Sequence, residues 1–120
     1  MAEINIKFDL IVTIVSKGYA TDVIQTSKKA GAEGGTILLG RGAGVHESGK
    51  IFGIPIEPEK EIVFTLVNNN KTNQVLKAIQ EELCLDEPGK GISFVLDVKK
   101  VVGICHLCGL EQKKDDEAKK

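Results

Sequence analysis

Two segments of this chain have the composition of strands that are buried on both faces. Residues 8–15 contain a nearly continuous run of aliphatic side chains, and five of the seven residues of Glu61–Val67 are apolar. A sheet built from such strands has to be covered from above and from below. The chain has only two helical segments, which can cover one face, so we expect another subunit to cover the other face. The chain is therefore predicted to form an obligate homo-oligomer.

The order of the predicted elements indicates one α+β domain. A helix with Val23 and Ile24 on one face follows the first strand, and a helix with Val75 and Ile79 in its apolar stripe follows the third strand. The resulting order, β-α-β-β-α-β, is the ferredoxin-like plan, a sandwich with both helices on one face of the sheet. The four strands are expected over Phe8–Val15, Thr36–Leu39, Glu61–Val67 and Ile92–Val98.

Individual residues predict where the helices begin and end. Asp22, with Gln25 three residues later, is expected to form a capping box, and the first helix is expected to end near Gly31. Thr72 is expected to cap the second helix. Cys84 lies beside the apolar stripe of that helix and is expected to be a small core residue.

The remaining segments are predicted to be connections, a final strand and a tail. Gly40–Glu59 contains five glycines and two prolines and is expected to be a long functional or mobile loop. The charged run over residues 57–61, where this loop enters the next strand, is expected to be solvated. The face of the Ile92–Val98 strand that carries Ser93, Val95 and Asp97 is expected to be more exposed to solvent than the other face. Val101–Cys105 is expected to add a short strand. Residues 111–120 are charged at eight of ten positions and are predicted to be a disordered tail, which leaves residues 1–110 as the domain.

Composition excludes several classes of protein. The chain has 120 residues and a formal net charge of −1, so a nucleic-acid or membrane-surface protein, which needs clustered basic residues, is not expected. An odd number of cysteines, three, argues against a secreted disulfide framework. There is no charged-then-apolar leader and no apolar run long enough for a span, so a cytoplasmic protein without membrane insertion is expected.

Two motifs bear on possible chemistry. Residues 44–50 fit the first seven positions of a phosphate loop, but Ile51 stands where the magnesium-binding hydroxyl belongs, so we reject that interpretation. Cys105 and Cys108 form a C-x-x-C pair. Two thiols are too few ligands for a tetrahedral zinc site, and no helix follows them to lower a thiol pKa as in thioredoxin-like proteins. Inert thiols, a regulatory redox pair or metal-linked contact, and a catalytic dithiol all remain open, and no resident metal is expected.

Glycine clusters mark two joints between a helix and a strand. Gly34-Gly35-Thr36 leads into the second strand, and Pro88-Gly89-Lys90-Gly91 leads into the last one. Glycine permits positive φ and lets backbone N–H groups converge on an anion, and Lys90 adds positive charge. Two such joints and a long loop favour a ligand cleft at a subunit boundary, although glycines that merely cap the helices are the alternative.

At these residues the chain resembles the PII-like nitrogen-regulatory family. The matching pieces are Ala30–Thr36, Glu59–Val63 and the closing stretch Lys90–Ile104, and the resemblance covers about residues 8–104. It implies a ferredoxin-like homotrimer that is a regulator and not an enzyme. It further implies that inter-subunit clefts bind an adenine nucleotide as an effector, and that a T-loop at about residues 40–58 controls a protein partner such as a transporter or metabolic enzyme.

The resemblance also implies site residues and a departure from the family pattern. Gly103 and Cys105 stand where well-studied members have arginines, and Phe64 stands in place of a glutamate, which implies a divergent branch that binds AMP, ADP or another small anion, or binds a partner without a ligand. The possible effectors that the resemblance implies are AMP, ADP or ATP. A thiol-redox or metal-binding protein using Cys105 and Cys108 is the alternative function, and a purely structural trimeric adaptor is a third. The implied ligand-binding residues are Ile14, Gly34, Gly35, Thr36, Leu66, Gly89, Lys90 and Gly91, and the implied partner-binding loop residues are Arg41, His46, Glu47, Lys50 and Phe52.

Overall fold

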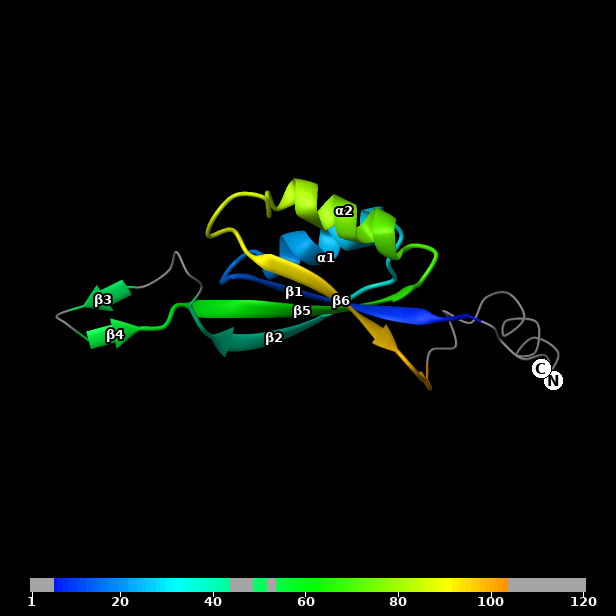
Figure 1. Cartoon of the computed structure of the whole chain (residues 1–120), viewed down its shortest axis with the longest axis horizontal. Coiled ribbons are helices and arrows are strands. Elements are labelled where there is room, and N and C mark those ends of the chain that lie inside the picture. Colours follow the sequence, from blue (N-terminus) through cyan, green and yellow to red (C-terminus); the bar gives the residue numbers. More distant parts are fainter. Residues whose placement is uncertain (1–5, 44–48, 52–53, 104–120) are drawn as a thin grey trace.

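The chain folds into a four-stranded antiparallel sheet with two helices on one of its faces (Figure 1). The computed structural model describes residues 6–43, 49–51 and 54–103. The sheet order is β2-β5-β1-β6, and a two-stranded ribbon pairs β3 with β4. The elements are β1 (Phe8–Ser16), α1 (Ala20–Lys29), β2 (Thr36–Arg41), β3 (Gly49–Ile51), β4 (Ile54–Ile56), β5 (Glu59–Asn68), α2 (Thr72–Glu82) and β6 (Ile92–Val98).

This arrangement confirms the predicted ferredoxin-like fold and all four predicted strands. The α+β order β-α-β-β-α-β is present once the β3–β4 ribbon is set aside. The expectation of a loop over Gly40–Glu59 was wrong in part, because β2 and β5 extend into it and its middle contains the ribbon. The ribbon lies beyond the ends of β2 and β5 (Figure 1). Pairing in the ribbon gives backbone N–H and C=O groups of this long connection hydrogen-bond partners.

The core lies between the sheet and the helices. Alternate residues of a strand point to opposite faces, so Ile11 on β1 and Val63 on β5 share the face that packs against Val23 of α1 and Ile79 of α2. All four side chains are fully buried. The apolar stripe predicted for the second helix is confirmed by the burial of Val75 and Ile79.

The opposite face of the sheet is apolar and uncovered in the single chain. Leu10 of β1 pairs with Leu66 of β5 and Leu96 of β6 on this face, and Val12 pairs in the same way with Phe64 and Phe94. Five large apolar side chains of this face are 38% to 56% exposed: Leu38, Phe64, Ile92, Phe94 and Leu96.

The prediction that the face of β6 with Ser93, Val95 and Asp97 is the more solvent-exposed one was wrong. The more exposed face of β6 is the apolar one, whereas Ser93 and Val95 are partly buried on the helix side. The hydroxyls of Thr13 and Ser93 lie 2.9 Å apart there, so the hydroxyl of Ser93 has a hydrogen-bond partner on the helix side. Val101–Gly103 forms no strand, and the rest of the predicted extra strand, the tail and both C-x-x-C cysteines lie outside the described residues.

The helix starts differ from the sequence prediction. The N-cap of α1 is Tyr19, so Asp22 lies inside the first turn and does not cap the helix. The N-cap of α2 is Lys71, and the hydroxyl of Thr72 donates to Asp9 Oδ2 at 2.6 Å, a bond that ties the start of α2 to β1. Thr72, which was expected to act locally, thus makes a tertiary contact instead.

Both helices end in the same kind of cap. The N–H of Ala32 donates to the carbonyl of Ser27 at 2.9 Å and that of Leu85 donates to Gln80 at 3.0 Å, the six-residue bond of a Schellman motif. Gly31 has φ +120° at the end of α1, as predicted, but Cys84 has φ 54° at the corresponding position after α2. This conformation directs Cys84 to the surface, so the expectation of a core thiol was wrong.

Candidate functional site

The two glycine-rich joints lie at opposite edges of the sheet. Residues 34–36 lead into β2, which forms one edge, and residues 89–91 lead into β6, which forms the other. Strands β5 and β1 separate them. One chain therefore does not bring the predicted ligand-binding residues together; it presents them as two half-sites.

The first half-site consists of Ile14 and the connection before β6. A Cβ added at Gly91 would lie 2.6 Å from the backbone oxygen of Ile14, and Gly91 has φ +140°, so only glycine fits here without movement. Gly89 also has positive φ, at +77°, and Lys90 between them is exposed. The side chain of Ile14 points to the uncovered apolar face of the sheet.

The second half-site consists of Gly34, Gly35, Thr36 and Leu66. A Cβ at Gly35 would meet three neighbours at 3.2 to 3.3 Å, including the backbone oxygen of Phe64, whereas a Cβ at Gly34 would meet nothing within 4 Å. Thr36 pairs with Phe64, and Leu66 lies two residues further along β5 on the same uncovered face. This half-site thus has a tightly packed glycine beside an open one.

The stem of the predicted T-loop is formed by the ends of β2 and β5. Arg41 lies opposite Glu59, and the N–H of Gly42 donates to the carbonyl of Pro58 at 3.1 Å. Lys50 lies in β3 opposite Pro55. The other predicted partner-binding residues, His46, Glu47 and Phe52, lie outside the described residues.

The T-loop stem is tied to the turn between β1 and α1. Glu61 Oε1 accepts hydrogen bonds from the N–H groups of Gly18 at 2.7 Å and Ala20 at 3.0 Å, so this carboxylate of β5 caps α1 from a distant strand. Lys17 Nζ lies 2.9 Å from Glu59 Oε2. The charged run was expected to be merely solvated; its half-buried Glu61 and its buried Lys60 show that this was wrong for part of it.

The Lys17–Glu59 ion pair shifts both of its pKa values. The hydrogen bond and charge of Lys17 lower the pKa of Glu59 below its ordinary 4.5, and the same contact with Glu59 raises the pKa of Lys17 above 10.5. Both side chains are well exposed, so solvent screens the attraction.

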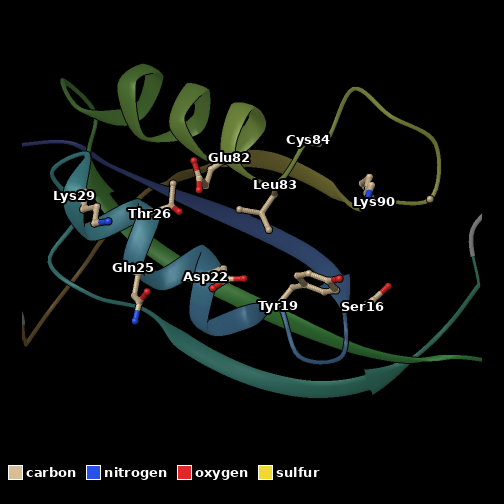
Figure 2. Close-up of a pocket in the computed structure, with 11 residues that line it drawn as sticks. Ser16, Tyr19, Asp22, Gln25, Thr26, Lys29, Glu82, Leu83, Cys84 and Lys90 are labelled. Atoms are coloured by element: carbon tan, nitrogen blue, oxygen red, sulfur yellow. The ribbon is translucent and has the colours of Figure 1, made fainter.

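A pocket of about 400 Å³ lies on the helix side of the molecule (Figure 2). Of the predicted ligand-binding residues, Gly89 and Lys90 line it. The other lining residues were not predicted as site residues, although Tyr19, Asp22, Thr26 and Lys29 follow the three- and four-residue spacing of one helical stripe. The full lining is Ser16, Tyr19, Asp22, Gln25, Thr26, Lys29, Glu82, Leu83, Cys84, Gly89 and Lys90.

The described part of the chain offers little for the alternative functions. Within it, no group of three or more histidine, cysteine or carboxylate side chains is placed to hold a metal ion. The thiol of Cys84 donates weakly to the carbonyl of Glu81 at 3.8 Å. The redox alternative rests on Cys105 and Cys108, outside the described residues, and stays a prediction. Neither of the two described helices has the length and apolarity that a bilayer span requires.

Comparison with solved structures supports the fold. The chain superposes on the GlnK–ATP complex of Bacillus subtilis with a TM-score of 0.64 at 18% identity, covering 82% of this chain and 87% of that one. It superposes on a putative PII-like signalling protein of Thermus thermophilus with a TM-score of 0.58 at 24% identity, covering 78% and 88%.

A third structure is the PII-like protein CPII of Thiomonas intermedia, bound to ADP, AMP and bicarbonate. The TM-score is 0.62 at 19% identity, and 82% of this chain and 97% of that one are covered. No curated protein matches the chain. The sequence profile described as nitrogen regulatory protein P-II matches residues 8–106, most of the length of the chain. The chain therefore belongs to the nitrogen regulatory protein P-II family.

Proposed function

We propose that this P-II family member is a homotrimeric, non-enzymatic regulator that binds an adenine nucleotide between subunits. The observation that carries the proposal is the separation of the two half-sites onto opposite edges of the sheet, Gly34–Thr36 on one and Gly89–Gly91 on the other. A cleft that uses both has to be closed by a second copy of the chain. The uncovered apolar face next to both edges supplies a reason for copies to associate.

The chemistry of the half-sites fits a nucleotide. Ile14 and Leu66 offer apolar contact for a base, whereas the glycine connection at residues 89–91 offers backbone N–H groups and the Lys90 ammonium for phosphates. Two of the similar structures are nucleotide complexes, one with ATP and one with ADP and AMP, which supports an adenine nucleotide as the effector here. Gly103 stands where well-studied family members have an arginine, so one positive charge for the phosphates is missing. We therefore expect AMP or ADP to bind at least as well as ATP.

The T-loop is the proposed output. Its stem is anchored through Glu59 and Glu61 to the β1–α1 turn, and the loop between the stem strands would contact a cytoplasmic partner such as a transporter or metabolic enzyme. The predicted partner-binding residues Arg41 and Lys50 lie in the stem strand and in the ribbon. A ligand that favours one state of the loop over another would then control partner binding.

Calorimetry with the full chain tests the proposal. The titrants are AMP, ADP, ATP, cyclic AMP and bicarbonate, with oligomeric state followed by sedimentation. Gly34→Phe is the cleft-blocking variant, because a Cβ at this position meets nothing within 4 Å in the single chain and the fold should be retained. We expect nucleotide binding in the native chain and its loss in Gly34→Phe.

The matched control is Asn73→Phe, which adds the same bulk to an exposed position of α2. It should bind the nucleotide as the native chain does. The proposed cleft would be refuted if the native chain bound none of the five titrants, or if Gly34→Phe bound the nucleotide with the same affinity as the native chain.

A further inference from the structure

The polar pocket on the helix side belongs to neither half-site, apart from its edge at Gly89 and Lys90. It lies within a single chain, between α1, the end of α2 and the connection that follows α2 (Figure 2). Tyr19 and Lys29 lie at the two ends of its stripe on α1. Ten helical residues rise about 15 Å, so a small molecule fills only part of the stripe.

Charges of opposite sign lie at different places along the pocket. Figure 2 shows Lys90, Ser16 and the Tyr19 hydroxyl at one end, Asp22 and Glu82 further along on facing helices, and Lys29 at the far end beyond these carboxylates. The first group can donate hydrogen bonds to a carboxylate or phosphate, and the second can accept them from an ammonium group. Leu83 lies between them and offers apolar contact.

The net charge of the lining decides between classes of ligand. Lys29 and Lys90 balance Asp22 and Glu82, so a simple anion would gain from the lysines what it loses to the carboxylates. A molecule with a negative and a positive group at its two ends avoids that conflict. We propose that this pocket binds a small zwitterion of the amino-acid type, with its carboxylate at Lys90 and its ammonium group at Asp22 and Glu82.

The pocket is placed to influence the T-loop. Ser16 and Tyr19 flank the turn whose Lys17 pairs with Glu59 and whose Gly18 N–H is bound by Glu61. A ligand that orders this turn therefore acts on both anchors of the T-loop stem. Because Lys90 also belongs to the proposed phosphate site, zwitterion and nucleotide should weaken each other's binding; this coupling, unlike the pocket itself, rests on the proposed function.

The test is an NMR titration of the ¹⁵N-labelled full chain with zwitterions of increasing length. The probes are glycine, β-alanine, γ-aminobutyrate and ε-aminocaproate, with acetate and ethylammonium as ligands of a single charge at matched ionic strength. We expect shifts at the amides of Tyr19, Thr26, Cys84 and Gly89, and one length that binds best. The affinity should be in the millimolar range, because the charged groups are exposed.

Charge-neutralising variants identify the contacts. Lys90→Gln and Glu82→Gln should each weaken the best probe about fivefold, the effect of one exposed ion pair. Glu87→Gln, an exposed residue of the same connection that does not line the pocket, should leave the affinity unchanged.

Three results would overturn the pocket proposal: no shifts at tens of millimolar probe, equal binding of acetate or ethylammonium, or equal effects of the two variants and the control. A nucleotide titration in the same samples, read at Gly34 and Gly35, separates this outcome from failure of the proposed function. Unchanged nucleotide affinity in saturating zwitterion would overturn the coupling at Lys90.

Discussion

At the scale of single residues, two buried threonines of the core differ in one hydrogen bond. Thr13 and Thr65 are both fully buried on the helix side of adjacent strands. The Thr13 hydroxyl lies 2.9 Å from that of Ser93, whereas Thr65 Oγ1 has no partner among the described residues. A buried unpaired hydroxyl destabilises the native state, so this pair provides a matched comparison.

We expect Thr65→Val to raise the free energy of unfolding by about 1 kcal/mol, because it removes an unpaired polar group and keeps the shape of the side chain. Thr13→Val should lower it by about 1 kcal/mol, since the hydroxyl of Ser93 loses its partner. Urea unfolding at one fixed protein concentration measures both. Equal destabilisation by the two substitutions would show that the hydroxyl of Thr65 has a hydrogen-bond partner in solution.

The left-handed residue after α2 gives a second prediction at this scale. Cys84 holds φ 54° in a position that favours glycine, while Gly31 fills the corresponding position after α1. Cys84→Gly should stabilise the chain by about 0.5–1 kcal/mol, because the left-handed conformation is unfavourable for a residue with a Cβ. Cys84→Ala keeps the Cβ and should show no gain, so equal unfolding midpoints for the two variants would contradict the explanation.

At the scale of elements, the tie between the T-loop stem and the β1–α1 turn depends on pH. A lowered pKa of Glu59 means that its contribution is present above pH 4.5 and is lost as the pH falls through the folded-state value. A raised pKa of Lys17 means that its contribution is present below pH 10.5 and is lost as the pH rises through the folded-state value above it. The pair therefore acts between these limits.

We expect the native chain to have a slightly higher urea midpoint than Glu59→Gln at neutral pH, and the difference to close well below pH 4.5, where Glu59 is protonated. Added salt should reduce the difference as well, because both side chains are exposed. Glu57→Gln, at an exposed position of the same segment, is the control and should show a smaller difference. A difference that persists far below the lowered pKa of Glu59 would assign the effect to something other than ionisation.

At the scale of the whole molecule, the uncovered sheet face predicts association. Phe94 lies at the centre of β6 on this face and is 40% exposed in the single chain. Phe94→Asp places a charge where a trimer would bury it, so we expect dissociation to monomers or loss of folding at micromolar concentration. Asn73→Asp, on the exposed surface of α2, should remain a trimer in sedimentation velocity.

A native chain that sediments as a folded monomer would refute the proposed trimer and the cleft with it. If the Phe94→Asp variant remained a trimer, the subunit interface would have to lie on another face of the molecule. In that second case the two half-sites could still meet across the edges β2 and β6.

The two helices, the four strands of the main sheet and their order could be predicted from the sequence, but the β3–β4 ribbon could not. Apolar runs predicted β1 and β5, three- and four-residue spacing predicted the buried stripe of α2, and Gly31 marked the end of α1. These features are set by backbone preferences and periodicity that act over a few neighbouring residues, so they can be read along the chain.

Which residues cap the helices, line the pocket and face each other became clear from the three-dimensional packing. Glu61 caps α1 across 41 residues of sequence, and the sheet order places Gly34 and Gly89 at opposite edges. The pocket likewise gathers Asp22 and Glu82 from two helices. Such contacts join residues that are far apart in the sequence, and patterns of neighbouring residues do not specify which distant side chains meet.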